Sequence, residues 1–587
     1  MPGLFGGDEN APPPNEMIAG TYRRSFHDEE VLCADPTLGM VHHGERDPGG
    51  YELVDGGDVV GVLYGALFGT PESFTRDLIQ RILDNPERII PMLDGSFALA
   101  CLDRDANRFV LATDKLGTRS VYYTRDPPFV FGSELSSVLT AIEDPTVDEQ
   151  SVSDLLTMIH IWGDRTLLED VKSLRPATYV LAEKGERSVR RYWSFLFDSR
   201  PEAGYVEETA GAYADAVSAS LETVPGTPGV WLSGGLDSRI LVAALERAGT
   251  EYRTYTYDRA MDPKFDPFLD DIDIANSVAD TLGVEHDIVG FTPETLAERL
   301  PELIEITDGQ LGWNTLIHLS HVFEIDATNP MVLYEGPPLV TGEKVGKNHL
   351  GRADHPADVL SELHTRVDPK LVKETLSGDV EPKDTFINEV RAVDQTGSDE
   401  QIREVTHLVY NSRKHFSGSN KVARARVGTR VPISSKGLLD LVGVFPQSLR
   451  RGSIPLTGGR IPHVPSRMKL ELMRELDGAL NEIPYGATQL PPSYPHAAHG
   501  AGFVVKNAVQ RLLSGSTVGE WYRENDCFRE YLDELLYGAV ERELFNAEPI
   551  LEARRAHLQG DDDHIVYISA VTTVELFYRR ILGQESA

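Results

Sequence analysis

The segment from residue 229 to residue 289 constrains the fold more than any other part of the chain. Short apolar runs at 229–232, 252–257 and 284–289 predict three strands. Two stretches with apolar residues at helical spacing separate these runs, and each stretch ends at a glycine. Strand, helix, strand, helix, strand at these lengths predicts a parallel, doubly wound α/β sheet.

A hexapeptide joins the first of these strands to the first helix. Its residues are Ser233, Gly234, Gly235, Leu236, Asp237 and Ser238. Two glycines, successive backbone N–H groups, hydroxyls and one carboxylate can cradle a pyrophosphate and its metal ion. In doubly wound sheets phosphates bind beyond the carboxyl ends of the strands, where this hexapeptide falls. A Ser/Gly turn that only caps a helix is the alternative, but the motif favours an ATP site.

The hexapeptide resembles the PP-loop of ATP pyrophosphatases, which cleave ATP between the α and β phosphates. Further blocks narrow the resemblance to the asparagine synthetase family, including its β-lactam synthetase relatives. These blocks are residues 93–100, 114–123, 131–135, 163–167, 191–193 and 430–432. They occur in the order of the family and together span most of the chain.

The resemblance implies two domains. Residues 1–200 are expected to form an α+β sandwich of the N-terminal nucleophile (Ntn) type, like a class II glutamine amidotransferase. Residues 201–587 are expected to form an α/β PP-loop domain, with a doubly wound parallel sheet and a helical C-terminal region. An acidic, polar stretch at 198–208 suggests the boundary. The acidic segment 377–400 is expected to be a polar, mobile insert.

The first half lacks the groups that glutamine hydrolysis needs. The family uses the thiol of an N-terminal Cys, with its own α-amine as base, but position 2 here is Pro2. Where the family has an Asn that completes an oxyanion hole, this chain has Tyr64, which has no amide N–H to offer. We therefore expect a packing role for this half. His42 and His43 are interpreted as polar turn residues.

For the second half, the resemblance implies that a carboxylate attacks the α-phosphorus of ATP and that ammonia or an amine then displaces AMP. Negative charge builds on phosphate oxygens, so Mg²⁺ held by a carboxylate is the expected aid. Asp237 is the predicted Mg²⁺ ligand, and its neighbours in the hexapeptide are predicted to bind pyrophosphate. Lys469 loosely resembles the late lysine of the family and would neutralise the leaving pyrophosphate. A solvated helix face is an equally weighted interpretation of Lys469.

The sequence does not decide which other acidic residues are metal ligands. Asp270 and Asp271 fit either a ligand role or the start of a helix, where the dipole favours acids. The family has a second acidic turn that falls here at Pro338 and Leu339, so a second metal ligand is missing in register. Glu335 and Glu343 are the candidates to replace it.

A second departure concerns the motif around Arg430. Gly428 stands where the family has Glu, and Ser434-Ser435 stands where it has Leu-Asp. Two functions therefore remain: an amide-forming ligase that uses ammonia or an amine and not glutamine, and a catalytically inactive ATP-binding or scaffold homologue. The substrates of the ligase would be a small carboxylic acid and an amine or ammonia.

The whole-chain charge excludes some partners. The 92 acidic and 56 basic residues give a formal net charge of −36, which disfavours nucleic acid and anionic membranes and suggests life in high salt. Three widely spaced cysteines predict neither a disulfide framework nor a thiolate metal site. The chain shows no signal peptide and no run of eighteen apolar residues, so we expect a cytoplasmic protein, with a homodimer as a possible state.

Overall fold

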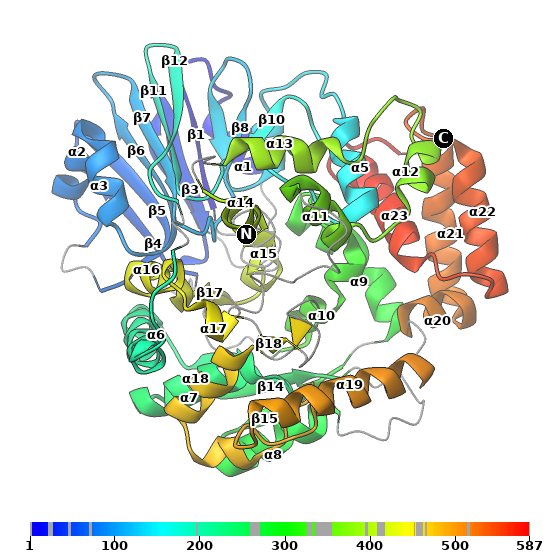
Figure 1. Ribbon diagram of the computed structural model, residues 1–587. Helices are drawn as coiled ribbons and strands as arrows, with labels where there is room; N and C mark the ends of the chain where they lie inside the picture. Colours follow the sequence, from blue (N-terminus) through cyan, green and yellow to red (C-terminus); the bar gives the residue numbers. More distant parts are fainter. Residues whose placement is uncertain are drawn as a thin grey trace.

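The structure is a computed structural model in which the described residues are 3–20, 28–44, 49–69, 73–194, 198–258, 270–290, 292–325, 332–334, 355–393, 397–407, 417–418, 420–450, 452–453, 462–463, 466–513 and 517–585. Figure 1 shows three regions: strand-rich layers at the N-terminus in blue and cyan, a group of helices at the C-terminus in orange and red, and a smaller sheet with its helices below them.

Two six-stranded antiparallel sheets form the N-terminal region. One has the order β10-β8-β9-β1-β3-β2 and the other β12-β11-β7-β6-β5-β4. The first contains β1 Gly3–Gly7, β2 Asp28–Ala34, β3 Thr37–His42, β8 Tyr122–Thr124, β9 Val130–Gly132 and β10 Val171–Ser173. The second contains β4 Tyr51–Asp55, β5 Val59–Leu67, β6 Gly95–Asp103, β7 Arg108–Thr113, β11 Thr178–Glu183 and β12 Glu186–Arg191. Apolar side chains of both sheets, such as Met40 and Val62, share one core.

Short helices complete this two-sheet α+β region. They are α1 Pro14–Ala19, α2 Arg76–Asp84, α3 Pro86–Ile89, α4 Leu135–Leu139 and α5 Glu149–Met158. Helix α2 covers the outer face of the second sheet, because Leu78 and Ile82 pack with Leu63 of β5 and Leu99 of β6. The structure therefore confirms the predicted α+β architecture of the first half.

The second half is built on a parallel sheet with the order β15-β14-β13-β16-β17. Its strands are β13 Pro228–Trp231, β14 Arg253–Tyr257, β15 His286–Val289, β16 Val332–Tyr334 and β17 Gly428–Arg430. The crossover helices α7 Leu236–Ala248 and α8 Asp271–Leu282 end at Gly249 and Gly283, both in the left-handed conformation. These bounds confirm the strand–helix alternation predicted for 229–289.

Further helices surround the sheet. Those that pack with α7 and α8 are α6 Tyr205–Leu221, α16 Lys436–Gly443, α17 Gln447–Arg450 and α18 Arg467–Leu476. The other helices of this half are α9 Pro293–Thr307, α10 Ile317–Ser320, α11 Pro356–His364, α12 Pro369–Thr375, α14 Asp399–Thr406, α15 Asn420–Arg424 and α19 His496–Leu513. Two short strands, β18 Gly452–Ser453 and β19 Pro462–His463, pair with each other in an antiparallel arrangement.

The chain ends in the predicted group of helices. They are α20 Thr517–Glu524, α21 Asp526–Val540, α22 Ala547–Gln559 and α23 Ile565–Arg580. Their apolar faces form one large core with α5 and α9, so the end of the chain packs against both halves of the molecule. In the described part of the chain, no helix is both long enough and apolar enough to cross a bilayer.

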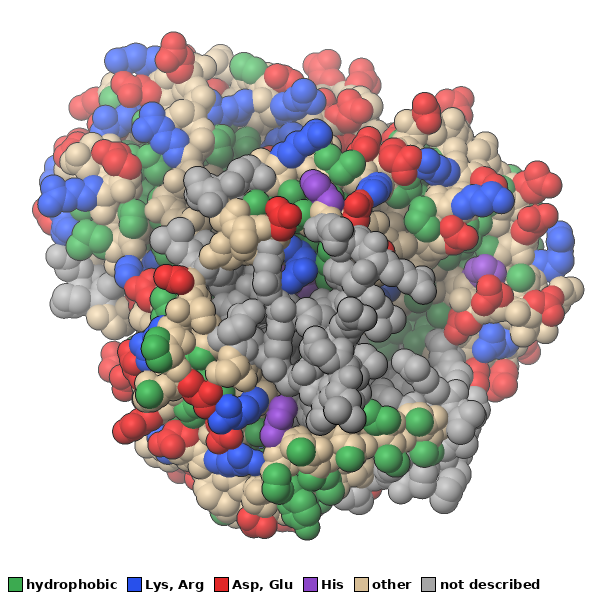
Figure 2. Space-filling view, viewed as in Figure 1, with side chains coloured by type: hydrophobic (Ala, Val, Ile, Leu, Met, Phe, Trp, Pro, Cys, Tyr) green, Lys and Arg blue, Asp and Glu red, His purple; other side chains and the backbone are tan. Residues whose placement is uncertain are grey.

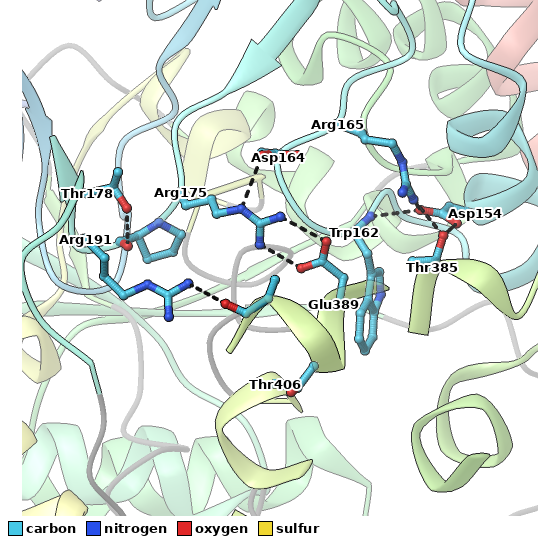
Figure 3. A network of polar contacts seen from close by, with 12 residues as sticks. Asp154, Trp162, Asp164, Arg165, Arg175, Thr178, Arg191, Thr385, Glu389 and Thr406 are labelled. Atoms are coloured by element: carbon cyan, nitrogen blue, oxygen red, sulfur yellow. Dashed lines mark hydrogen bonds and ion pairs between the residues drawn. The ribbon is translucent and has the colours of Figure 1, made fainter. Parts of the chain in front are cut away.

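The prediction of a mobile insert at 377–400 is wrong. The structure places helix α13 (Asp384–Ala392) there, with the Phe386 side chain fully buried. Glu389 of this helix forms a two-pronged ion pair with Arg175, 2.7 and 3.0 Å long, and Thr385 contacts the Asp154–Arg165 pair (Figure 3). The acidic composition misled the prediction, because one of those carboxylates is a buried partner of an arginine and not a solvated charge.

Two smaller expectations can also be compared with the fold. All three cysteines are free thiols, as predicted. The interpretation of His42 as a polar turn residue is wrong, because it ends strand β3 with 4% exposure. Its ring stacks on Tyr51 at 4.1 Å, and its Nδ1 accepts a hydrogen bond from the Gly44 amide.

Candidate active site

The turn of residues 233–238 connects β13 to α7 at the carboxyl edge of the parallel sheet. From β13 the chain first builds β14 and β15 on one side, and later adds β16 on the other side of β13. The order of strands therefore reverses at β13. Such switch points open a crevice beyond the strand ends, where ligands of doubly wound sheets bind.

Hydroxyl groups within the turn fix its shape. The Ser233 amide donates to Ser238 Oγ at 3.1 Å, the two serine hydroxyls lie 3.2 Å apart, and the Gly235 amide donates to Ser233 Oγ at 3.2 Å. Ser233, Gly235 and Asp237 are half-buried, so one side of the turn remains open to solvent. The first turn of α7 adds the positive end of its dipole at the same place.

The two aspartates before α8 have separate positions. Asp270 caps the helix, since its Oδ1 accepts a hydrogen bond from the Asp273 amide at 2.7 Å. Asp271 lies against the turn: a Cβ added to Gly234 would stand 2.6 Å from Asp271 Oδ1. Both aspartates therefore lie at the start of α8, as the helix-start interpretation predicted, and Asp271 also packs directly beside the turn.

Asp237 and Lys469 meet at the N-terminus of α7. Lys469 Nζ, from α18, lies 2.8 Å from Asp237 Oδ2, and the lysine side chain is only 3% exposed. Asp237 Oδ1 is buried and has no hydrogen-bond partner among the described residues. A buried carboxylate oxygen without a donor suits a cation, and Mg²⁺ is commonly held by one or two carboxylates together with phosphate oxygens. The residues present therefore fit Mg²⁺ carried with a phosphate ligand.

Arg239 attaches a second segment to the turn, and the sequence analysis did not identify it. Its fully buried guanidinium donates to the carbonyls of Leu480, Ile483 and Pro484, at 3.3, 2.8 and 2.9 Å. Burial lowers the pKa of Arg239 to about 10. A charged residue directly after the hexapeptide, on the apolar face of α7, was the signal that could have found it.

The attached segment reaches the turn through Gly486. The Gly486 amide donates to the Gly234 carbonyl at 2.8 Å, and the Gly486 carbonyl accepts from Lys506 Nζ of α19 at 2.6 Å. Lys506 is therefore a second cation close to the turn. Nothing in its local sequence indicated this position, because 272 residues separate it from Gly234.

Some predicted residues lie outside the described part of the chain. They are Pro2, Glu335, Pro338, Leu339 and Glu343. Among the described residues no group of three or more His, Cys, Asp or Glu side chains is arranged to hold a metal ion.

Tyr64 lies on β5 in the interior of the first half. It is 2% exposed, and the Arg119 guanidinium covers its ring at 4.8 Å from the centroid. A large, stacked aromatic ring thus stands where the resemblance places a small amide side chain.

Comparisons with known proteins show which families the two halves of the chain resemble. A glutamine amidotransferase domain model matches residues 70–193, and an asparagine synthase model matches residues 210–324. The order of the two matches is that of an amidotransferase-like domain followed by a synthetase domain. Together with the curated relatives described next, they show that the chain is similar to proteins of the asparagine synthetase family.

Similar curated proteins include two from Bacillus subtilis (strain 168). Asparagine synthetase [glutamine-hydrolyzing] 1 is 24% identical over 306 residues, which cover 49% of this chain and 47% of that protein. Asparagine synthetase [glutamine-hydrolyzing] 3 is 26% identical over 253 residues, 40% of this chain and 41% of that protein. Amidase chyE of Penicillium rubens is 26% identical over 298 residues, 46% of this chain and 42% of that protein. The matched region thus spans less than half the length of each relative.

A solved structure also shows a weak similarity. Glutamine phosphoribosylpyrophosphate amidotransferase from B. subtilis, complexed with ADP and GMP, matches with a TM-score of 0.22 and 12% identity. The match covers 49% of this chain and 90% of that chain. At this score nothing follows for the fold or for the ligands.

Proposed function

We propose that this protein is an ATP-dependent, amide-forming ligase that does not hydrolyse glutamine. A carboxylic acid would attack the α-phosphorus of ATP, pyrophosphate would leave, and ammonia or an amine would then displace AMP. In this proposal residues 1–200 are a degenerate Ntn-type domain, and residues 201–587 are the PP-loop domain that carries the reaction. We also propose that the protein is cytoplasmic and that it forms a homodimer.

One observation carries the proposal: Asp237 Oδ2 and Lys469 Nζ lie 2.8 Å apart at the half-buried start of α7, beyond the end of β13. The N–H groups of the 233–238 turn other than those of Ser233 and Gly235, which donate to serine hydroxyls within the turn, would bind the pyrophosphate part of ATP. Lys469 and Lys506 would balance its charge. Asp237 would hold Mg²⁺, which would neutralise phosphate oxygens when bound. The chain as a whole has a net charge of −36, so an anionic ligand such as ATP needs positive charge close to its site. Lys469 and Lys506 supply this charge.

The N-terminal half supports the exclusion of glutamine hydrolysis. The stacked Tyr64–Arg119 pair offers no amide donor where the resemblance places the side chain that completes an oxyanion hole. Ammonia or an amine from solution is therefore the proposed nucleophile.

The test is ATP–pyrophosphate exchange over a panel of carboxylic acids, with Mg²⁺ and without glutamine. At least one acid is expected to support exchange, and Asp237→Asn is expected to reduce it by about 100-fold or more, as removal of a group that stabilises charge in the transition state does. Asp77→Asn is the matched control, because Asp77 also lies in the first turn of a helix, α2, and its side chain is 83% exposed. The control should retain full exchange.

Other outcomes separate the alternatives. If ATP with Mg²⁺ raises the melting temperature but no acid gives exchange or AMP, the protein is the catalytically inactive ATP-binding homologue. Glutamate released from glutamine would contradict the exclusion of glutamine hydrolysis. If ATP with Mg²⁺ leaves the melting temperature unchanged, both functions are wrong.

A further inference from the structure

Two buried arginines lie where the two halves of the molecule meet. Arg119 follows β7 in the first half, and Arg424 ends α15 in the second; they are 1% and 3% exposed. Neither forms an ion pair with any residue in the described ranges. Burial of a charge is costly unless an opposite charge compensates it, so this pair requires an explanation.

The hydrogen bonds of the two guanidinium groups leave donors unused. Arg119 Nη2 donates to the carbonyls of Gly49 and Thr429, at 3.2 and 3.1 Å. Arg424 donates to the carbonyls of Thr118 and Ser417, at 3.3 and 3.5 Å. Three buried nitrogens, Nε and Nη1 of Arg119 and Nε of Arg424, have no partner among the described residues. The acceptors are neutral carbonyls, which do not balance two positive charges.

Tyr64 brings the two arginines into one cluster. Its ring lies under Arg119, 4.8 Å from the guanidinium carbon, and its hydroxyl interacts with Arg424. Burial is the main cause that lowers the pKa of Arg424 to about 10, and Arg119 lowers it further. Arg424 is therefore still protonated at neutral pH, beside a second cation. We call Arg119, Arg424 and Tyr64 the interface arginine cluster.

Among the residues that the structure describes, the neighbours do not cancel this charge. The fully buried Asp114 is the neighbouring carboxylate, but its oxygens already accept hydrogen bonds from the amides of Phe97, Leu116 and Thr118. A third buried guanidinium, that of Arg430, donates to the same Gly49 carbonyl as Arg119, at 3.0 Å. Among these groups the positive charges outnumber the negative one.

We propose that the interface arginine cluster is a structural binding site for a small inorganic anion of the chloride type. The ion would accept hydrogen bonds from the unused nitrogens of Arg119 and Arg424, and it would supply the missing negative charge. A small, monovalent ion fits because these nitrogens are closed off from solvent. Since the cluster joins Arg119 of the first half to Arg424 of the second, the ion would stabilise the contact between the halves.

The direct test is a crystal of the full chain soaked in bromide, which replaces chloride and can be located by its anomalous scattering. We expect a bromide peak within hydrogen-bond distance of Arg119 and Arg424. If well-diffracting crystals show ordered bromide elsewhere and none at the cluster, the proposal is wrong. This result does not depend on any variant or on ATP, so it also leaves the proposed ligase function untouched.

A solution test uses thermal unfolding in sodium chloride and in sodium gluconate at equal ionic strength. Chloride should raise the melting temperature in a saturable way that the bulky gluconate does not reproduce. Arg424→Gln should remove the difference between the two salts. Arg426→Gln is the matched control, because Arg426 lies two residues further along and is exposed; it should keep the difference. Equal melting temperatures of the unaltered protein in both salts would overturn the proposal, and so would an Arg424→Gln variant that retains the chloride effect.

Discussion

Gly234 has the least room for a side chain in the 233–238 turn. An added Cβ would lie 2.6 Å from Asp271 Oδ1, 3.2 Å from Ile274 Cδ1 and 3.3 Å from Asp271 Cα. All three atoms belong to the first turn of α8, and one of them is a backbone atom. The close approach of α8, and not a positive φ, is thus the reason for glycine here.

We predict that Gly234→Ala weakens ATP binding by at least tenfold, because the methyl group displaces the Asp271 carboxylate from the turn and crowds the Asp271 backbone. Gly235→Ala is the matched comparison, since its Cβ would meet only the Ser233 hydroxyl, at 3.1 Å. Isothermal titration with ATP and Mg²⁺ measures both. Equal affinities for the two variants would show that contact with Asp271 does not shape the site.

Arg239 holds the 480–484 segment against α7 through charged hydrogen bonds to backbone carbonyls. We predict that Arg239→Met lowers the free energy of unfolding by about 3 kcal/mol, because buried carbonyls lose their donors. Arg253→Met, at a residue whose side chain is 49% exposed and paired with Glu285, should cost less than about 1 kcal/mol. The free energies of unfolding of both variants can be measured in urea. A similarly small decrease in both would contradict the structural role of Arg239.

At the scale of elements, α13 links the halves through charge and not through apolar area alone. Arg175, between β10 and β11, pairs with Glu389 of α13, and the glutamate side chain is only 5% exposed (Figure 3). Breaking one partner of a buried pair leaves an uncompensated charge, which costs more than the pair itself contributes.

We therefore predict that Glu389→Gln or Arg175→Met alone lowers the free energy of unfolding by about 3 kcal/mol, and that the double variant is more stable than the sum of the two losses implies. The exposed pair Arg76–Asp58, with side chains 53% and 49% exposed, is the control. It should show less than about 1 kcal/mol of coupling in the same double-mutant cycle. Strict additivity at Arg175 and Glu389 would refute the link.

At the scale of the whole molecule, the net charge of −36 is the dominant property. Figure 2 shows acidic side chains spread over the visible face, with apolar side chains along α19 as an exception. Val504 and Val505 of that helix are 46% and 58% exposed, and the helix contains no acidic residue. Repulsion between so many carboxylates opposes the compact state unless salt screens it.

We predict that the melting temperature rises by several degrees when sodium gluconate increases from about 0.01 M to about 1 M, over which the Debye length falls from about 30 to about 3 Å. Gluconate is used so that general screening is separated from the specific effect of chloride. Differential scanning fluorimetry measures the shift. A melting temperature that falls or stays constant would contradict the prediction of a surface adapted to high salt.

The sequence by itself determined the features that depend on local periodicity. Apolar spacing and terminal glycines predicted α7 and α8 together with the strands around them, and the 233–238 hexapeptide was placed correctly at the end of a strand. The same reasoning failed for α13, because composition does not reveal whether a glutamate faces water or an arginine.

Only the tertiary structure decided which distant residues meet. Lys469 lies 232 residues from Asp237, and the contact depends on α18 packing against α7. Arg239, Lys506 and the interface arginine cluster are likewise defined by segments far apart in the sequence. A local pattern encodes the period of a helix or strand, whereas the position of one element against another follows from how all apolar faces are buried together.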